Sequence, residues 1–550
     1  MITDARKVPS DLTIVCDVCV VGAGAAGITL AHELRTSGKQ VVLLEGGGTR
    51  LESSAQDLYK GEVVDPERHG PLDQYRQRRF GGTTAVWGGR CAPFTAVDFE
   101  ERPWVPYSGW PIHKRDLDSY YLRAHQYCDL GEYSYEVAAA LPHQPPEMIP
   151  GFHSDDVCTD RLWRFSPPTH FGKTFIGALK HCQNIRVYLH SNCLKIRLHK
   201  NGGSVDHLQV VSAGKIVSVR AQHYVLATGG LEATRLLLVS NDVHRGGIGN
   251  DRDLVGRFYL SHMTGDVGEV LFTPKRGHVL WNYERAKDGV YCRRTISIPE
   301  AKQRKDQLLN FRAILSHPPI ADPRHGNAIL SAMYLIKRYL AHRIPPEYSK
   351  SLSGMMPVRR VLAHSLNVAR DFGNVGKFST MWFRERILST RKLPSVVLES
   401  KSNIYTLHID AEQSPNPDSR VSLSEEKDAF GINRLKVDWR FSDLDVQSIV
   451  KSCCLIAHAL EHSGSGKILF HLESLADRVS ADCSVGSHHI GSTRMARLPS
   501  QGVVDENCRV HGVDNLYIAS SSVFPTSSFA NPTLTIVAMA IRLADHVRAC

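Results

Sequence analysis

One stretch of about thirty residues near the N-terminus constrains the fold more than any other part of the sequence. Residues 14–21 form a nearly continuous apolar run, which indicates a strand buried on both faces. The motif Gly-Ala-Gly-Ala-Ala-Gly at 22–27 follows, then a helical pattern, and then a second strand over 40–44 that ends at Glu45. This arrangement predicts the parallel, Rossmann-like sheet of a dinucleotide-binding domain.

Each residue of this motif has its own expected role. Gly22 permits a tight turn, Gly24 lets the backbone approach a pyrophosphate, and Gly27 lets the helix pack on the strand. Glu45 lies where a carboxylate accepts hydrogen bonds from an adenosine ribose. The motif therefore predicts a bound dinucleotide, but it does not distinguish FAD from NAD.

The length of 550 residues favours two domains, because one compact core rarely grows so large. Regular strand patterns return at 184–190, 222–230 and 406–410, and a helix is expected over 445–462. The predicted class is α/β, or α+β overall: a Rossmann-like domain in separate segments, with an inserted substrate-binding domain on an antiparallel sheet with helices. The assigned segments are 1–100, 184–265 and 481–550 for the nucleotide, and 101–183 and 266–480 for the substrate.

Cysteine usage and hydropathy suggest the compartment. Thirteen cysteines are scattered rather than spaced as a framework, which is typical of reduced thiols. Cys16 and Cys19 lie three apart in a predicted strand and face opposite ways, so we expect two core residues and no metal site. No apolar run approaches the roughly 20 residues of a membrane span, and the first one leads directly into the glycine motif. We expect a cytoplasmic protein without a signal peptide.

The net charge of +10 is concentrated in one segment. Residues 331–400 hold twelve Lys or Arg against four Asp or Glu. Residues 334–343 and 359–366 read as basic amphipathic helices. No recognised nucleic-acid module accompanies this charge, so nucleic acid is not an expected partner. The segment is either a solvated helical cap or a surface for a membrane, an acidic partner subunit or an anionic substrate.

A second glycine cluster occupies residues 79–90, where Gly81, Gly82, Gly88 and Gly89 fall within nine positions. So many glycines disfavour a regular element, which suggests sharp turns or close approach to a ligand. The alternative is an ordinary surface loop.

Two motifs near the C-terminus carry residues suited to chemistry on an alcohol. His488 and His489 lie in extended sequence, so only one ring can readily enter a given pocket. A histidine can accept an alcohol proton near neutral pH. Asn531 precedes Pro532 at the head of a clear helical pattern, where it could be a plain N-cap. The positive helix N-terminus would also stabilise an anion there.

Together these motifs resemble the glucose–methanol–choline (GMC) oxidoreductases, which are FAD enzymes that oxidise alcohols, sugars and polyols. Within that family, the chain is most similar to the branch with fructose and gluconate dehydrogenase large subunits and with sugar or aminoglycoside oxidases. The motifs that carry the resemblance, in the family's order, are 22–27, 81–89, 108–111, 253–257, 412–417, 488–495 and 531–535.

The resemblance implies a set of site residues. His488 aligns with the base and Asn531 with the residue opposite it, so His489 is the neighbour that faces away. Val86 occupies the position where some members carry a histidine bonded to FAD, so we predict non-covalent FAD. Ser520 departs from the acidic or glycine residue common in the family. The expected FAD contacts are Gly22, Gly24, Ala26, Gly27, Glu45, Gly81, Gly82, Thr83, Trp87, Gly88, Gly89, Cys193, Leu194, Ala227, Gly229, Ser520, Pro532 and Thr533.

The expected activity is oxidation of a hydroxyl of a sugar, polyol or aminosugar to a carbonyl, with His488 as base and hydride transfer to flavin N5. The sequence leaves the electron acceptor open among oxygen, a quinone and a cytochrome. It also leaves open a peripheral membrane or partner subunit contacting residues 331–400. Two alternatives remain: a non-redox flavin lyase and a non-catalytic FAD-binding subunit of an electron-transfer complex.

Overall fold

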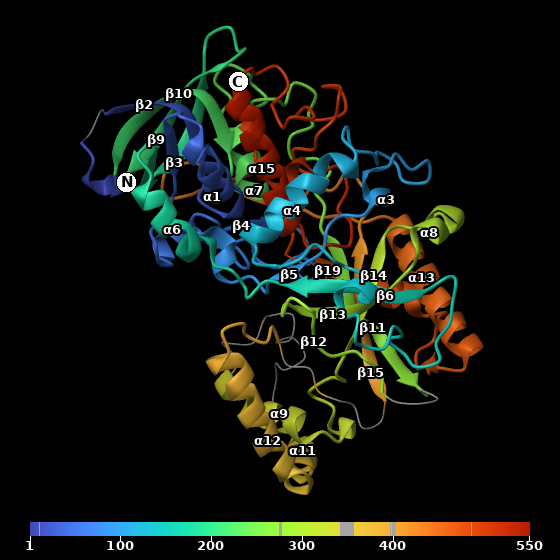
Figure 1. Ribbon diagram of the computed structural model, residues 1–550. Coiled ribbons are helices and arrows are strands. Elements are labelled where there is room, and N and C mark those ends of the chain that lie inside the picture. The colour runs from blue at the N-terminus through green and yellow to red at the C-terminus, as the bar shows by residue number, and fades with distance from the viewer. Residues whose placement is uncertain (10–11, 274–277, 341–356, 396–397, 399–402, 486) are drawn as a thin grey trace.

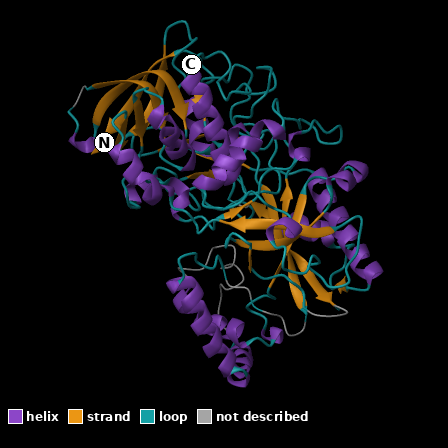
Figure 2. Ribbon diagram, in the orientation of Figure 1, coloured by secondary structure: helices purple, strands orange, loops and turns teal. Residues whose placement is uncertain are grey.

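The computed structural model describes residues 1–550 except 10–11, 274–277, 341–356, 396–397, 399–402 and 486. Two large sheets lie at opposite ends of the main body, with helices packed around each of them (Figures 1 and 2). A small lobe of helices projects from the end that carries the antiparallel sheet. The predicted combination of a Rossmann-like sheet and an antiparallel sheet is confirmed.

The first sheet has the strand order β1-β7-β3-β2-β10-β9-β8, and β20 also pairs with β10. The strands from β1 to β10 in this order are parallel, and β3 is buried along its whole length. The predicted strands over 14–21, 40–44 and 184–190 correspond to β2, β3 and β7. The bounds are β1 (Ile2–Asp4), β2 (Thr13–Val21), β3 (Val41–Leu44), β7 (Ile185–Leu189), β8 (Asn192–Leu198), β9 (Val205–Ser212), β10 (Lys215–Leu226) and β20 (Leu516–Ile518).

Helices pack against this sheet and against one another. α1 follows the glycine motif and contacts α15 and α6, while α4 lies along α15 (Figure 1). Cys16 and Cys19 are both buried in β2, as expected of core residues. The helices of this part are α1 (Ala25–Glu33), α2 (Ser53–Asp57), α3 (Ala96–Phe99), α4 (Asp118–Tyr127), α6 (Phe171–His181), α7 (Gly230–Val239) and α15 (Thr533–Ala549).

The second sheet is antiparallel and has the order β18-β11-β15-β14-β13-β6-β5, with β12 on β13 and β19 on β11. The predicted strand over 406–410 lies within β15, and the predicted helix over 445–462 lies within α13. The bounds are β5 (Arg90–Cys91), β6 (Cys158–Phe165), β11 (His262–Phe272), β12 (Glu284–Arg285), β13 (Tyr291–Ser297), β14 (Phe311–Ser316), β15 (Ile404–Glu412), β18 (Gly466–Ile468), β19 (Ser484–Val485), α5 (Val137–Ala140), α8 (Glu300–Asp306), α13 (Asp443–Ser463) and α14 (Leu475–Asp482).

A third, three-stranded sheet connects segments that we assigned to different domains. β4 (Gly61–Val63) pairs in parallel with β17 (Asn433–Asp438), which pairs with β16 (Arg420–Lys427). In addition, α4 and α6 lie within 101–183, the assigned substrate segment, yet pack against α15 and α1. The two-domain division stays a prediction. These contacts show where segments assigned to different domains pack against each other.

The projecting part, which we call the helical lobe, comprises residues 328–340 and 357–388. It contains α9 (Ala328–Leu340), α11 (Val358–Arg370), α12 (Phe372–Trp382) and a π-helical turn, η8 (Phe383–Leu388). The predicted basic helices fall on α9 and α11, although residues 341–343 of the first lie outside the described residues. Within the described chain, we find no helix with the length and apolarity needed to cross a membrane.

Candidate functional site

A cavity opens at the carboxyl ends of β2, β3 and β10, where the glycine motif turns into α1. The space inside it that protein atoms leave free is about 1360 Å³, part of it open to solvent. Thirteen of the eighteen residues expected to contact FAD line this cavity. These are Gly22, Gly24, Ala26, Glu45, Gly82, Thr83, Trp87, Cys193, Leu194, Ala227, Gly229, Ser520 and Thr533.

The five other expected residues lie immediately behind or beside this lining. A Cβ on Gly27 would stand 1.9 Å from the carbonyl oxygen of Gly22, so Gly27 allows α1 to contact the preceding turn, close to its expected role. The amide of Gly81 donates to the carbonyl of Ala23 at 2.8 Å. Gly88 and Pro532 adjoin Trp87 and Thr533 of the lining along the chain, and Gly89 lies two residues after Trp87.

The two glycine clusters touch each other. A Cβ on Gly82 would lie 2.9 Å from the Cα of Gly24, while a Cβ on Gly24 would meet nothing within 4 Å. The second cluster is therefore wedged against the first and forms part of the cavity wall. It is not an ordinary surface loop, which was the alternative interpretation.

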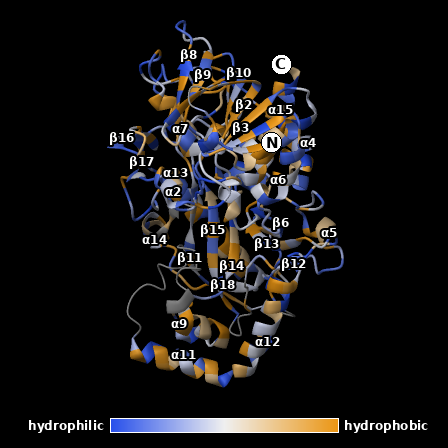
Figure 3. Ribbon diagram, turned by 90° about the vertical axis from the view of Figure 1, so that its left-hand side faces the viewer, coloured by the Kyte–Doolittle hydropathy of each residue, from blue (hydrophilic) through white to orange (hydrophobic). Residues whose placement is uncertain are grey.

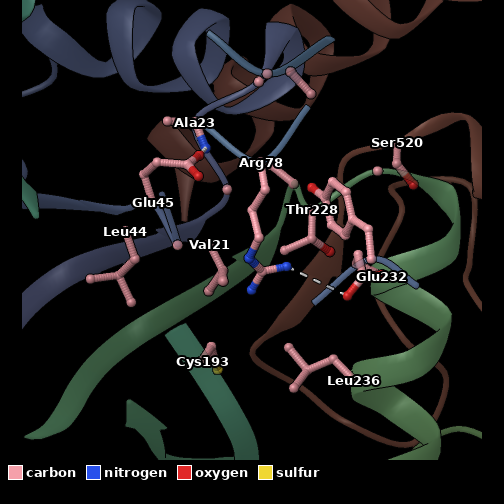
Figure 4. A pocket seen from close by; sticks show the side chains of 18 of the residues that line it. Val21, Ala23, Leu44, Glu45, Arg78, Cys193, Thr228, Glu232, Leu236 and Ser520 are labelled. Carbon is pink, nitrogen blue, oxygen red and sulfur yellow. Dashed lines mark hydrogen bonds and ion pairs between the residues drawn. The ribbon is translucent and has the colours of Figure 1, made fainter. Parts of the chain in front are cut away.

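Backbone donors hold Glu45 at the end of β3. The amide of Ala23 donates to one carboxylate oxygen at 3.0 Å, and the amide of Gly47 donates to the other at 2.9 Å. Burial nevertheless raises the pKa of Glu45 above its ordinary value, since it disfavours the charged form more than the two amides favour it. The acid expected at the ribose position is thus fixed in place and turned toward the cavity (Figure 4).

A charged wall of the cavity was not predicted from the sequence. Arg78 extends into the cavity, donates to the side-chain oxygen of Asn192 at 2.9 Å and lies 3.6 Å from the Glu232 carboxylate (Figure 4). Its guanidinium stands 5.2 Å from the centre of the Tyr59 ring. These side chains come from a loop, from β8 and from α7, and no local motif joins them. These side chains come together only in the tertiary structure of the protein.

The cavity fits a dinucleotide such as FAD on three grounds. The α1 N-terminus and the close-packed glycines present backbone amides to an anion. Glu45 is the acid that a ribose would contact. Two buried atoms of the lining, Thr228 Oγ1 and Gln77 Oε1, have no hydrogen-bond partner among the described residues, so the wall offers unpaired polar groups to a ligand.

The proposed catalytic pair lies beside this cavity. Asn531 Nδ2 is 3.1 Å from His488 Nε2, so the two side chains that are 43 positions apart in the sequence face each other. Asn531 lies two residues before Thr533, and His489 accepts a 2.6 Å hydrogen bond at its carbonyl oxygen from Ser521 Oγ. Both Thr533 and Ser521 line the cavity, so the pair adjoins it.

A chain of hydrogen bonds fixes how His488 is protonated. The carbonyl of Ser527, which can only accept, is 3.1 Å from His262 Nε2, so that nitrogen carries hydrogen. In neutral His262 the other nitrogen, Nδ1, is then an acceptor, and it lies 2.9 Å from His488 Nδ1. His488 therefore holds its hydrogen on Nδ1 and leaves Nε2 with a lone pair.

At the other end of this series of hydrogen bonds, Arg90 fixes the orientation of the Asn531 side chain. Arg90 Nε, which can only donate, lies 2.8 Å from Asn531 Oδ1. The amide NH₂ of Asn531 is thereby turned toward His488 Nε2, in agreement with the assignment from the other side. Arg90 in turn makes a two-point ion pair with the Asp410 carboxylate, at 3.0 and 3.1 Å, and its guanidinium lies 4.1 Å from the Trp163 ring centre.

The same surroundings keep His488 neutral. Burial, followed by the neighbouring His262 and Arg90, holds the pKa of His488 well below its ordinary value, although Asp410 opposes this. Burial also lowers the pKa of His262. Burial alone would raise the pKa of Asp410, but Arg90 and nearby His408 and His262 hold it below its ordinary value. The site is therefore built for a neutral imidazole beside an ionised pair.

His489 points to a different environment, as the extended backbone predicts. Its Nδ1 lies 2.6 Å from the hydroxyl of Tyr259, and its ring lies 6.1 Å from the ring of His69, nearly parallel to it. Tyr259 also contacts His69 Nε2 at 2.8 Å. The two adjacent histidines thus have separate partners.

The alternative interpretation, in which Asn531 is a plain N-cap, does not agree with the structure. α15 begins at Thr533, its cap residue is Pro532, and the Asn531 side chain is bonded to Arg90 and His488 instead. The helix therefore offers no structural reason for the Asn531 side chain, which strengthens its assignment to the site.

Three residues of this site were missed from the sequence: His262, Arg90 and Asp410. Arg90 closes the second glycine cluster and begins β5, Asp410 lies in β15, and His262 begins β11. Each of the three lies in a strand or motif that the sequence shows, but the residues next to it in the sequence do not indicate that the three side chains meet. In the described chain, no group of three His, Cys, Asp or Glu side chains is arranged to hold a metal ion.

Comparison with known proteins agrees with this fold and site. An FAD binding domain model matches residues 15–69, and a GMC oxidoreductase model matches residues 415–540. A flavin-binding oxidoreductase is the class that these matches define. The chain belongs to the GMC oxidoreductase family.

Full-length relatives and solved structures extend the comparison. The chain is 22% identical to 6'''-hydroxyparomomycin C oxidase of Streptomyces lividus over 98% of this chain and 93% of that protein. It is 22% identical to the fructose dehydrogenase large subunit of Gluconobacter japonicus over 98% of both. A fungal aryl-alcohol oxidase is similar in fold, with a TM-score of 0.55, 14% identity and coverage of 98% of this chain and 99% of that chain.

Proposed function

We propose that this chain is an FAD-dependent enzyme that oxidises a hydroxyl group of an alcohol, such as a sugar, polyol or aminosugar, to a carbonyl. One observation carries the proposal: His488 Nε2 holds a lone pair, and the amide of Asn531 lies 3.1 Å from it. A neutral imidazole nitrogen beside a donor amide is the arrangement that can accept a hydroxyl proton while its oxygen stays hydrogen-bonded.

In this reaction the chain handles the proton and the oxygen. FAD, when bound, supplies the hydride acceptor at flavin N5. His488 accepts the hydroxyl proton at Nε2, and its Nδ1 hydrogen stays bonded to His262. Asn531 donates to the substrate oxygen, because Arg90 holds the amide in the orientation that presents NH₂. His489 takes no part.

The relatives support this chemistry. Several of them are named as oxidases or dehydrogenases, and their names include an aminoglycoside oxidase and a fructose dehydrogenase subunit. A hydroxyl on a sugar or aminosugar is therefore our proposed substrate class. The electron acceptor can be oxygen, a quinone or a cytochrome. A reducing, cytoplasmic location agrees with the thirteen cysteines, which are all unbridged.

An anaerobic titration tests the redox proposal. The yellow holoenzyme is mixed with candidate sugars, polyols and aminoglycosides, and flavin absorbance is followed before and after air is admitted. Bleaching by one of these alcohols is the expected result. Absence of bleaching with every candidate would favour a flavin lyase or a non-catalytic FAD-binding subunit. Rapid recovery of colour in air would identify an oxidase.

We also propose that FAD is held without a covalent bond. Val86 stands where some relatives of this family have the bonding histidine, and its side chain is exposed just after a short 3-10 helix (Gly82–Ala85). After acid denaturation, the flavin should stay in the supernatant. Yellow colour in the protein pellet would contradict this.

A further inference from the structure

Helix α11 of the helical lobe is amphipathic in the reverse of the usual sense. Its buried side chains are polar: His364 stacks on Tyr334 of α9 at 4.1 Å and lies 3.0 Å from Ser331 Oγ, and Asn367 donates to the carbonyl of Pro323 at 2.8 Å. Three of its apolar side chains point outward instead, whereas Val361 and Val368 are half-buried. The exposed ones are Val358, Leu362 and Leu366, with 73%, 59% and 56% of their surfaces exposed.

These three positions follow one another at intervals of four residues, so they form a single stripe along the helix. A surface helix of a globular protein normally turns such a stripe toward the core. Here the opposite face makes the contacts with α9, and the stripe has no contact that would bury it within the described protein.

The rest of the lobe is also rich in exposed apolar side chains, although four of them, Met381, Trp382, Ile387 and Leu388, line hollows beside the body of the protein. Ten of the 22 large hydrophobic side chains that are exposed in the described chain lie in the lobe, although it is less than a tenth of the sequence. Isolated exposed apolar residues are ordinary, but such a concentration marks an interaction surface. Besides the stripe, they are Ile336, Phe372, Met381, Trp382, Phe383, Ile387 and Leu388.

Positive charge accompanies the apolar side chains. Residues 357–388 hold six Lys or Arg and two Asp or Glu. One of the two acids, Glu385, is engaged by Arg285 of β12 at 2.8 Å and so faces the body of the protein. Arg359 and Arg360 are exposed next to the apolar stripe. Figure 3 shows α11 and α12 at the outer edge of the molecule, with hydrophobic and hydrophilic segments alternating along them.

We propose that the helical lobe docks on an anionic phospholipid surface. Apolar side chains would enter the headgroup boundary, and the arginines would lie against lipid phosphates, as in interfacial amphipathic helices. A second copy of this chain fits less well, because it would bring two positive surfaces together. The lobe projects from the body of the protein in Figure 1, so its outer face can reach a flat surface.

Docking through this lobe would bring the end of the enzyme that carries the antiparallel sheet close to the lipid. A hollow lies where the lobe meets the antiparallel sheet, between Tyr283 and Tyr291 of the sheet and Met381 and Leu388 of the lobe. The ring of Tyr283 meets that of Phe165 edge-on at 5.0 Å, and Phe165 is paired in register with Arg90.

Vesicle flotation of the holoenzyme tests the proposal. One set of vesicles is phosphatidylcholine alone, and the other is equal parts of phosphatidylcholine and phosphatidylglycerol. We expect the protein to float with the mixed vesicles only, and the bound fraction to fall as salt is raised. Failure to float with mixed vesicles would overturn the proposal, as would equal flotation with both sets.

Two variants assign the binding to the lobe. Arg359→Ala with Arg360→Ala should weaken binding about thirtyfold, since each arginine near an anionic surface contributes roughly fivefold. Leu362→Ser with Leu366→Ser should weaken it by at least about tenfold. Both variants should keep the activity with a soluble alcohol and dye, and the circular dichroism, of the parent protein.

The matched control is Leu498→Ser, because Leu498 is 54% exposed and lies outside the lobe. It should bind like the parent. If the lobe variants also bind like the parent, the lobe is not the docking surface. If vesicles do not bind and the lobe variants instead abolish a concentration-dependent dimer or the capture of an acidic protein, the surface serves a protein contact and the lipid proposal is wrong.

Discussion

The proposed catalytic region and the helical lobe use polar and apolar side chains in opposite ways. Around His488, a series of hydrogen bonds pairs donors with acceptors, from the carbonyl of Ser527 through His262, His488 and Asn531 to Arg90. On α11 of the lobe, the polar His364 and Asn367 are buried, and Leu362 and Leu366 lie outside. The polar groups of the first region find their partners within the protein. The apolar face of the lobe, in contrast, would be buried only by contact with another surface.

This contrast has a consequence for mutations. In the catalytic region, removing one group leaves its neighbours with an unpaired donor, acceptor or charge, so effects on rate and stability should be large. On the outer face of the lobe, a side chain is exposed in both the folded and the unfolded states, so its removal should hardly change stability. The predictions below test this difference, beginning with the largest effect.

His488→Ala removes the proposed proton acceptor. We expect flavin reduction by the alcohol to slow by about 10²–10⁴-fold, because a positioned base is lost, while FAD stays bound. Anaerobic stopped-flow absorbance measures this. His489→Ala is the matched control, since its ring contacts Tyr259 and not Asn531. A large loss in His489→Ala with normal flavin reduction in His488→Ala would show that His489, and not His488, is the base.

Asp410→Asn breaks the ion pair that supports Asn531. It leaves Arg90 without its carboxylate, and we expect a loss of about 3 kcal/mol in the free energy of unfolding, measured by denaturant titration. Because Asp410 raises and Arg90 lowers the pKa of His488, the substitution should lower that pKa further.

The role of His488 as proton acceptor sets the direction in which the rate of flavin reduction changes with pH. His488 accepts a proton only when neutral, so flavin reduction falls as the pH drops through the pKa of His488. The acidic limb of the rate profile should therefore lie below the ordinary histidine pKa of about 6.5 in the parent protein and at still lower pH in Asp410→Asn. Asp266→Asn is the control, because Asp266 contacts His408 on the same sheet. A limb that moves to higher pH in Asp410→Asn would refute the arrangement.

A pair of glycine substitutions separates packing from cofactor binding. In Gly27→Ala the new Cβ would clash with the carbonyl of Gly22, so we expect about 1–3 kcal/mol of destabilisation in the apoprotein. Gly24→Ala meets open space at the cavity, so the apoprotein should keep its stability and instead bind FAD more weakly. Thermal unfolding of the apoprotein and flavin titration distinguish the two. Equal losses of apoprotein stability would contradict this assignment.

The sequence predicted the parts of the fold that have a local signal. The apolar runs became β2, β3 and β7, and the glycine motif became the start of α1. Of the residues in the proposed site, the sequence identified only His488 and Asn531, each of which lies in a recognisable motif. Arg90, His262 and Asp410 come from three strands of one antiparallel sheet, and their pairing depends on strand order that no local pattern reveals.

The N-cap interpretation of Asn531 fails for the same reason. A local rule assigns Asn before Pro to the helix cap, because its side chain can accept from the first amides. In the fold, Pro532 takes the cap position, and Arg90 provides a charged donor to the Asn531 side chain. A charge-assisted hydrogen bond is stronger than one to a backbone amide, so the tertiary partner prevails over the local one.

The smallest expected effect is on the outer face of the lobe. Leu366→Ser should change the free energy of unfolding by no more than about 0.5 kcal/mol, because Leu366 is 56% exposed. Leu330→Ala, in the buried cluster that packs α9 against Ile320 and Leu398, should cost about 2–5 kcal/mol of local stability. Hydrogen exchange of α9 and α11 amides measures both. If Leu366→Ser loosened the lobe as much as Leu330→Ala does, the leucine stripe would be packed within the chain, and its availability to a lipid surface would be refuted.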